Sequence, residues 1–475
     1  MNIISIAFGL VFCFFLYGYA VLRGLSRTWL MLYVIAASLL FFYLANGWLM
    51  LLLPATALVS WGISRLLLRQ TRCRKLLLTI GVLADLAPLL YYKYSNFGIE
   101  TINAIFATNF SLLSIALPIG ISFYTFQAIS HLVDVYRGRF REDVSLLEYG
   151  FYISFFPLLL AGPITRAGYL IPQLRRRDAS GKWSMPVNTH MLYMGLWLIL
   201  LGLLKKAVVA DYIAQYNNWI FDDPAAYSGF ENLMGIIGYA VQIYCDFSGY
   251  SDLSIGMAGL MGLRLPDNFR VPYRSENVTE FWHRWHISLS TWFRDYVYIP
   301  LGGNRKGKFR TYLNNMITML VAGLWHGATW MFVIWGAMHG LALILHKMNQ
   351  PWLRRIPNKW YVRTLSWLLT FVCLGVTWVF FRATSMETAL TLLRHATLDV
   401  NWGYLWPFVT ARPVWTAMVV LLLLMHAVPE KRYSRLRTRF VCCPWYIKLI
   451  IVFVVFQLVV QFHTSNVQPF IYSQF

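Results

Sequence analysis

Histidines are the residues of this 475-residue chain that are best placed to do chemistry. His326 lies in the segment GLWHGATW, between two short apolar stretches at 311–324 and 329–345. An ionisable side chain is costly in apolar surroundings, and a role in a cavity is the usual reason to keep one. The pattern predicts a helical hairpin with a functional imidazole at its apex. A core imidazole that hydrogen-bonds the two helices is the alternative.

Two further histidines lie in FWHRWHISLS, residues 281–290. On a single helix, His283 and His286 are three residues apart and share a face with Ser290, so that two imidazoles and a hydroxyl line one side. An aromatic belt at the membrane interface is the alternative. The HxxH spacing could supply two metal ligands, but Arg284 stands where a zinc protease needs a glutamate base. We therefore expect no metal.

Cations follow this segment in Arg294-Asp295 and in the run 302–306, Gly302-Gly303-Asn304-Arg305-Lys306. Small residues let backbone N–H groups approach an anion, so this turn is suited to the phosphates of a nucleotide-like donor. A charged cytoplasmic loop explains the same residues equally well. Arg294 and Asp295 could also form a structural ion pair.

Several polar residues interrupt other apolar stretches. Asp246 lies in a stretch broken by Gly and Ser, where an acid should pair with a cation or hydroxyl; it would orient an imidazole or hold the broken helix together. Lys205 and Lys206 end an apolar helix, and we interpret them as anchors that reach the membrane interface. Gln127 and Arg166 lie near Pro or Gly breaks, which suits the lining of a tunnel.

The elements that position these residues are membrane helices. The chain is 58% hydrophobic and only 13% charged, whereas a soluble domain has roughly 25% charged residues. A soluble globule, a disordered chain and a disulfide scaffold are excluded, and the six cysteines form no CxxC pair. Apolar stretches of about the 20 residues that span a bilayer lie near 3–22, 29–45, 48–68, 76–92, 111–132, 191–210, 232–260, 365–381, 408–428 and 445–461.

The net charge of +21 fits this arrangement. Basic clusters fall between the apolar stretches, as in membrane proteins oriented by their cytoplasmic loops, so we expect no nucleic-acid partner. If the N-terminus is outside and each long apolar stretch crosses once, every basic cluster lies in the cytoplasm and both chain ends lie outside. The first apolar stretch has no basic n-region and no small-residue cleavage site, so it is interpreted as a retained helix.

Two regions do not fit the pattern in which each apolar stretch crosses the membrane once. Residues 149–163 are apolar but have basic clusters on both sides, which favours a dip into the membrane that returns to the same face. Residues 264–310 are too aromatic for a plain loop and too charged for a lipid-facing helix. We find no internal repeat or linker and expect one domain over 1–475.

Taken together, several segments resemble the membrane-bound O-acyltransferases, and most of all the bacterial branch that O-acetylates alginate and peptidoglycan. The D-alanyl transferases of teichoic acid are similar. The resemblance covers roughly 115–345 plus the tail. It rests on SFYTFQAISHLVDVYRG (122–138), FFPLLLAGPITR (155–166), QIYCDFSGYSDLSIGMAGLMG (242–262), FWHRWHISLSTWFRDYVYIPLGGNR (281–305), LWHGATWMFVIWGAMHG (324–340) and QPFIYSQF (468–475).

The resemblance implies an all-α polytopic membrane protein with about 11–12 transmembrane helices and re-entrant segments around a central tunnel. Residues 1–110 would form less typical N-terminal helices, 115–345 the catalytic core and 361–475 the C-terminal helices. His326 would be the essential catalytic residue, and His286 would lie in the cytoplasm-facing part of the site.

The resemblance also implies partners. The protein would lie in the lipid bilayer of the bacterial inner membrane, with no bound cofactor and with acetyl-CoA or another acetyl thioester as donor. A separate periplasmic transferase of the SGNH type would carry the acetyl group to the polysaccharide. Residues expected to bind donor or substrate are His283, Ser290, Arg284, Arg294, Asn304, Arg305, Lys306, Gln127, Arg166 and Asp246.

Two other functions fit the composition. A transporter or flippase would use intramembrane acids and broken helices, although we find no repeat symmetry between the two halves. A non-catalytic scaffold would only recruit the periplasmic transferase, and it would tolerate the loss of both histidines.

Overall fold

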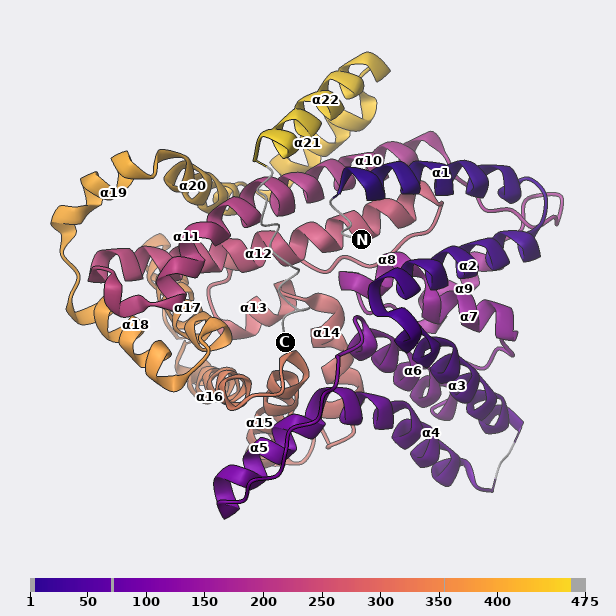
Figure 1. Ribbon diagram of the computed structural model, residues 1–475, viewed down its shortest axis with the longest axis horizontal. Coiled ribbons are helices and arrows are strands. Elements are labelled where there is room, and N and C mark those ends of the chain that lie inside the picture. Colours follow the sequence, from indigo (N-terminus) through magenta and orange to yellow (C-terminus); the bar gives the residue numbers. More distant parts are fainter. Residues whose placement is uncertain (1–4, 70–71, 354, 463–475) are drawn as a thin grey trace. The chain divides into compact units, whose positions relative to one another are not determined.

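The computed structural model describes residues 5–69, 72–353 and 355–462 (Figure 1). It is 79% helical, and within those ranges the extended pairing is limited to an isolated bridge between Arg177 and Trp183. The all-α fold class is therefore confirmed. The terminal motif 468–475 lies outside the described residues.

The chain forms two compact units, which are described separately. The first comprises Met1–Ile199 and Leu253–Pro266, and the second comprises Leu200–Asp252 and Asp267–Phe475. The organisation as one domain stays a prediction. Two helices, α10 (Thr189–Leu203) and α12 (Gly229–Leu260), have residues in both units.

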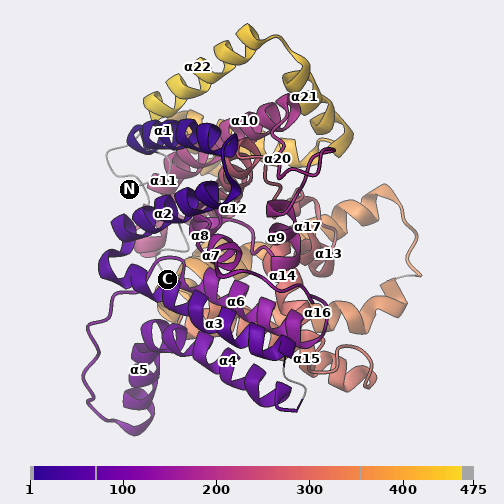
Figure 2. The ribbon, with the colours of Figure 1, turned by 90° about the vertical axis from the view of Figure 1, so that its right-hand side faces the viewer.

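The first unit is a cluster of helices in which α3, α4 and α6 pack against one another (Figure 2). Its elements are α1 (Ile6–Arg23), α2 (Arg27–Asn46), η1 (Gly47–Leu51), α3 (Leu52–Arg69), α4 (Arg74–Leu89), η2 (Leu90–Tyr94), α5 (Ser95–Phe106), α6 (Ile121–Tyr136), α7 (Leu146–Ser154), α8 (Phe156–Ala161) and α9 (Ala167–Leu174).

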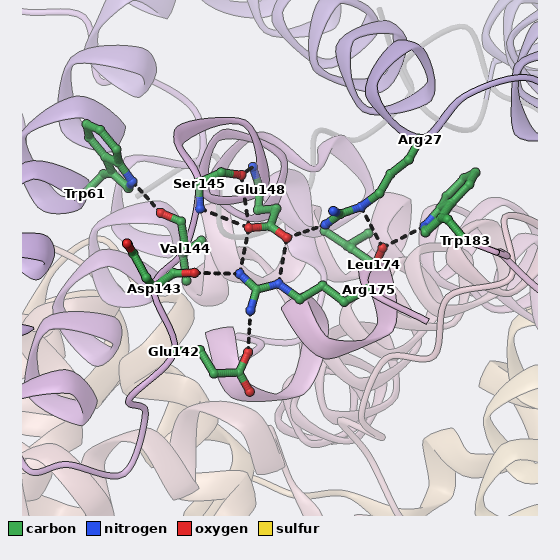
Figure 3. Close-up of polar contacts among 10 residues, drawn as sticks. All are labelled: Arg27, Trp61, Glu142, Asp143, Val144, Ser145, Glu148, Leu174, Arg175 and Trp183. Carbon is green, nitrogen blue, oxygen red and sulfur yellow. Dashed lines mark hydrogen bonds and ion pairs between the residues drawn. The ribbon is translucent and has the colours of Figure 1, made fainter. Parts of the chain in front are cut away.

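A buried carboxylate ties three of these helices together (Figure 3). Glu148 in α7 accepts hydrogen bonds from Arg175 at 2.6 and 2.7 Å, and it also pairs with Arg27 at the start of α2. Ser145 and Glu148 form a capping box that begins α7. Because Arg27 also donates to the carbonyl of Leu174 at 3.1 Å, the cluster joins α2, α7 and the end of α9.

The predicted re-entrant segment consists of two short helices. The helices α7 and α8 have 9 and 6 residues, and the backbone breaks between them at Phe155. At 1.5 Å per residue, neither is long enough to cross about 30 Å of hydrocarbon. Neither helix alone would cross, and the dip into the membrane with return to the same face stays a prediction.

The second unit holds the histidine segments. Its elements are η3 (Leu204–Ala210), α11 (Asp211–Asp222), η4 (Pro224–Ala226), η5 (Pro272–Arg274), α13 (Val278–Arg284), α14 (Ile287–Phe293), η6 (Arg294–Tyr298), α15 (Gly307–His326), α16 (Trp330–Leu353), α17 (Trp360–Arg382), α18 (Met386–Leu398), η7 (Trp402–Tyr404), α19 (Leu405–Ala411), α20 (Pro413–Ala427), α21 (Glu430–Cys442) and α22 (Trp445–Phe462).

The described helices make this a multi-pass membrane protein. Six helical runs are long and apolar enough to cross a bilayer, or seven if one bent pair counts as a span. This number is lower than the 11–12 expected, because some apolar stretches merge and others break. The stretches at 29–45 and 48–68 form one run, Arg27–Arg69, whereas the helices on either side of Arg412 meet at a bend of 106°.

Candidate active site

The predicted hairpin around His326 is present as α15 and α16, which lie side by side in Figure 1. The two helices approach closely where both carry glycine. A Cβ atom at Gly323 would collide with the carbonyl oxygen of Phe332, and one at Gly336 with that of Met319. Small residues at such a crossing let two membrane helices pack backbone against backbone. The hairpin therefore holds His326 on a rigid support.

His326 is the last residue of α15 and is 2% exposed. Its ring lies among aromatic rings, with centroid distances of 5.0 Å to Trp325, 4.9 Å to Trp335 and 5.3 Å to Phe381 of α17. The imidazole is thus enclosed by aromatic rings that shield it from water.

The expectation that His283 and His286 share one helix face is wrong. Helix α13 ends at Arg284, Trp285 is extended, and His286 has a left-handed backbone with φ 43° before α14 begins. The preceding loop causes this break, because Arg270 N–H bonds the carbonyl of Arg284 and Ile287 N–H bonds that of Asn268, both at 2.9 Å. His283 is consequently exposed, whereas His286 is 0% exposed.

Asn268 fixes the orientation of His286. The Asn268 amide N–H donates to Ser251 at 3.1 Å, so its oxygen faces the other way, where it accepts the backbone N–H and the hydroxyl of Ser288 at 3.2 and 2.8 Å. The same oxygen lies 3.1 Å from His286 Nδ1, which must then carry the proton. Burial lowers the pKa of His286 to about 3, so the ring is neutral with its lone pair on Nε2.

The rings of the two predicted catalytic histidines, His286 and His326, both contact the indole ring of Trp325. The ring centroid of Trp325 is 5.9 Å from that of His286 and 5.0 Å from that of His326. The sequence pattern indicates both histidines but gives no sign of the roles of Asn268, Ser288 and Trp325. The segment LPDNFR has the composition of an ordinary loop, and no local signal marks Asn268 as a partner of a residue 18 positions later.

A cavity of about 460 Å³ is lined by His283, whereas His286 and His326 are not among its lining residues. Residues of α13, α14, η6, α15 and α16 line it, including the predicted His283, Ser290 and Arg294. Its wall on α15 reaches Ala322, one helical turn before His326. Most of the lining is apolar, with a few convergent polar groups, as in small-molecule sites.

The predicted anion-binding residues are dispersed. Arg284 pairs with Glu280 at 2.8 Å, and Arg294 pairs with Asp295 at 2.8 Å, which is the structural alternative for that residue. The Gly302-Gly303 turn has positive φ at both positions, as expected of glycine, but it presents Asn304, Arg305 and Lys306 to the exterior. These three residues do not line the cavity.

Asp246 forms a buried ion pair, and its predicted role in orienting an imidazole stays a prediction. Its carboxylate lies 2.5 Å from the ammonium of Lys206, which also lies 2.7 Å from Asp211. Lys206 is 1% exposed, and Lys205 pairs with Asp252 at 2.7 Å. The expectation that these lysines reach the membrane interface is wrong for Lys206, which is buried between two carboxylates, and it stays a prediction for Lys205. Asp246 therefore holds α12 to the η3–α11 segment.

Gln127 and Arg166 belong to the first unit. Gln127 is buried in α6, and its side-chain amide has no hydrogen-bond partner among the residues that the structure describes. Arg166 is half-buried and precedes α9. Their predicted role in lining a tunnel stays a prediction. Within the described ranges, no group of three His, Cys, Asp or Glu side chains is arranged to hold a metal ion.

Several known proteins are similar to this chain in sequence. The chain is 42% identical over 329 residues to the probable alginate O-acetylase AlgI of Azotobacter vinelandii, a match that covers 67% of this chain and 62% of that protein. It is 34% identical over 406 residues to the peptidoglycan O-acetyltransferase of Helicobacter pylori, covering 79% and 76%. It is 29% identical over 271 residues to the teichoic acid D-alanyltransferase of Bacillus subtilis, covering 54% and 67%.

The chain thus spans less than two thirds of the alginate acetylase and about three quarters of the Helicobacter protein. The family model described as MBOAT, membrane-bound O-acyltransferase family, matches residues 138–383, a range that includes His286 and His326. This agrees with the resemblance in the sequence motifs. The chain therefore belongs to the membrane-bound O-acyltransferase family.

Proposed function

We propose that the protein is an O-acetyltransferase of the bacterial inner membrane. It takes an acetyl group from a cytoplasmic thioester, acetyl-CoA or a similar donor, and passes it across the membrane for O-acetylation of an extracytoplasmic polysaccharide of the peptidoglycan or alginate type. The family and the names of the relatives support acyl transfer. The contact of both His286 and His326 with the ring of Trp325 is the structural observation that carries the proposal. A ligand-sized cavity lined by α14 and α15 also supports it.

His326 acts as the general base. A neutral imidazole takes the proton of the acceptor hydroxyl while the hydroxyl oxygen attacks the thioester carbonyl carbon. The tetrahedral intermediate then expels the thiolate, the carbon–sulfur bond breaks, and the thiolate receives the proton from the imidazolium. An ester and a free thiol result. The aromatic rings around His326 support this role, because they exclude the water that would hydrolyse the thioester.

His286 orients the donor. Its Nδ1–H is directed to Asn268, so Nε2 is an acceptor held in a fixed position by backbone and side-chain hydrogen bonds. Such an acceptor positions a polar N–H or O–H group of the bound thioester.

A partner completes the reaction. The acetyl group leaves the membrane on a hydroxyl of a periplasmic transferase of the SGNH type, which esterifies the polysaccharide. The membrane protein then meets the polymer only indirectly, and the polymer is chosen by the partner.

Replacement of His326 by Ala and by Gln tests the base. We expect polysaccharide acetylation to fall by at least about 100-fold, the lower end for general-base catalysis, in variants that insert normally. His190→Gln is the matched control, because His190 is an exposed histidine. Normal acetylation in His326→Ala would refute the assignment.

The two rival functions are tested with purified protein in detergent and a labelled acetyl thioester. Acyl transfer without vesicles, lost in His326→Ala, contradicts pure transport. A scaffold would keep cellular acetylation when both histidines are replaced, whereas an enzyme would lose it.

A further inference from the structure

An apolar groove lies in the first unit, between α2, α3 and α7. Its volume is about 450 Å³, and Ser154 is the single polar side chain among the residues that line it. Leu58 and Leu146 line the groove and are 52% and 40% exposed, so the groove opens to the outside of the unit. Because α2 and α3 belong to an apolar run long enough to cross a bilayer, we expect this opening to face the hydrocarbon chains of the membrane.

One end of the groove is charged. Glu148 pairs with Arg27, the first residue of α2, and Asp143, just before α7, pairs with Arg65 near the end of α3 at 3.0 Å. The start of α2, the end of α3 and the start of α7 therefore lie at the same end of the groove, beside Leu146. Figure 3 shows Arg27, Asp143 and Glu148 together at this end.

The dimensions of the groove favour a thin occupant. Its lining on α7 extends from Leu146 to Ser154, and eight residues at 1.5 Å each correspond to about 12 Å. A helix with its side chains is at least about 10 Å wide, so about 12 Å of it would fill about 900 Å³, twice the volume present. An extended chain advances about 3.3–3.6 Å in three bonds, so roughly ten bonds cover this length. A helix of a second copy or of a partner is thus too wide, whereas one hydrocarbon chain fits.

Both arginines at the charged end can bind a further anion. The Arg65 side chain is 34% exposed, and within the described residues its guanidinium bonds through Nη2 alone. Arg27 is 32% exposed and donates from Nε to Leu174 and from Nη2 to Glu148, which leaves Nη1. The ring of Trp61 lies 5.2 Å from the Arg65 guanidinium, an arrangement typical of a membrane interface. This end of the groove therefore suits a phosphate at the level of the lipid headgroups.

We propose that this groove holds one acyl chain of an anionic phospholipid, with the lipid phosphate at Arg65 and Arg27. A zwitterionic lipid suits the site less, because its ammonium group would lie near the same two cations. The predicted sidedness puts these arginines at the cytoplasmic surface, so the lipid belongs to that leaflet. The bound chain joins α7 to the two membrane helices and stabilises the first unit. Lipid binding here is independent of the proposed function.

Lipid binding to the purified full chain tests the charged end. Phosphatidylglycerol and phosphatidylcholine with identical acyl chains are titrated in detergent, and bound lipid is counted by native mass spectrometry. We expect phosphatidylglycerol to bind about 10-fold more tightly, as suits a charge-assisted hydrogen bond, and to raise the melting temperature. Arg65→Gln should remove this preference, whereas Arg65→Lys should keep most of it. Arg394→Gln is the charge-matched control, because Arg394 is an exposed arginine of the second unit.

Filling the groove tests the position of the acyl chain. In Gly150→Leu the new side chain enters the groove, since a Cβ at Gly150 meets only Ile35, at an ordinary contact of 3.5 Å. Leu58→Trp fills the half-exposed opening and replaces Gly150→Leu if that variant does not fold. Each should weaken the binding of both lipids by at least about 10-fold, because several methylene groups lose their apolar contacts. Gly62→Leu is the control, since Gly62 does not line the groove and a Cβ there meets no atom within 4 Å.

Four results would overturn the proposal. The first is equal affinity of the wild type for the two lipids, and the second is unchanged phosphatidylglycerol affinity in groove-filled variants that melt like the wild type. The third is equal protection from melting by inorganic phosphate, which would indicate an anion site without an acyl chain. The fourth is a dimer in the native mass spectra that is lost in Leu58→Trp, which would assign the groove to a second copy of the chain.

Discussion

His286 and Asn268 form a hydrogen bond of 3.1 Å between Nδ1 and the side-chain oxygen, although 18 residues separate them. The bond coincides with the break between α13 and α14, where His286 has φ 43°. A left-handed backbone at a residue other than glycine is uncommon and persists only where the surroundings hold it. Ser288, Ser251 and the 268–270 loop supply that support. The same set of hydrogen bonds around Asn268 therefore holds both the left-handed backbone and the tautomer of His286.

Asn268→Asp should shift the pH dependence of acetylation. A carboxylate 3.1 Å from Nδ1 favours the imidazolium and raises the pKa of His286 above its lowered value in the wild type. The active neutral ring is present above its pKa and is lost as the pH falls through it. The acid limb of the pH–rate profile should therefore move to higher pH, with activity near pH 8 largely kept.

Asn268→Ala is the companion variant for this profile. It removes the orienting oxygen without adding charge, so activity should fall at every pH while the acid limb stays in place. If the profiles of wild type and Asn268→Asp superimpose, the neutral His286 ring has no part in the reaction.

Gly336→Ala should loosen the α15–α16 hairpin. The new Cβ would collide with the carbonyl of Met319, and forcing such a contact costs about 1–3 kcal/mol. We expect a lower melting temperature in detergent and reduced acetylation, because the hairpin carries His326. Gly62→Ala is the control, since a Cβ there meets no atom within 4 Å. Equal melting temperatures for both variants would contradict the close crossing.

Glu148→Gln should destabilise the first unit in a pH-dependent way. Burial alone would raise the pKa of Glu148, but hydrogen bonds from Arg175, Ser145 and Arg27 outweigh it and lower the pKa from 4.5 to about 2. The carboxylate thus stabilises the fold above about pH 4.5, and this contribution is lost as the pH falls toward 2. The loss at neutral pH should be about 1–3 kcal/mol, toward the lower value because both guanidinium groups are partly exposed.

Melting temperatures measured between pH 3 and 7 check this prediction. The gap between wild type and Glu148→Gln should narrow as the solution becomes more acidic. Glu142→Gln should change little, because that side chain is half exposed. A gap that is constant with pH would assign the effect of Glu148 to packing.

Lys206→Met should be strongly destabilising. It leaves Asp211 and Asp246 buried without the ammonium between them, and removing one partner of a buried ion pair costs about 3–5 kcal/mol. Neutralising both acids as well, in Lys206→Met/Asp211→Asn/Asp246→Asn, should recover part of the loss. Lys182→Met, at an exposed lysine, is the control. A triple variant less stable than Lys206→Met would show that the carboxylates have a separate role.

The sequence by itself determined the membrane class, the helical fold and the hairpin around His326. These follow from composition and from apolar runs, which depend on neighbours within one helix. The family also followed from contiguous motifs. The prediction of about 11–12 spans was less reliable, because whether two apolar stretches join, as in Arg27–Arg69, or bend by 106° depends on packing.

Tertiary structure decided where the polar side chains lie. An unbroken helix through 281–290 is what local spacing favours, but hydrogen bonds from Arg270 to Arg284 and from Ile287 to Asn268 end one helix and begin another. By its sequence context Lys206 resembles an anchor at the membrane interface. In the structure it forms an ion pair with Asp246, which lies 40 residues later in the same unit. Such pairings require the chain to return to a distant residue, and no local pattern of hydrophobicity encodes that return. The residue types therefore indicate the chemistry of the site, whereas the positions of its side chains can be known only from the tertiary structure.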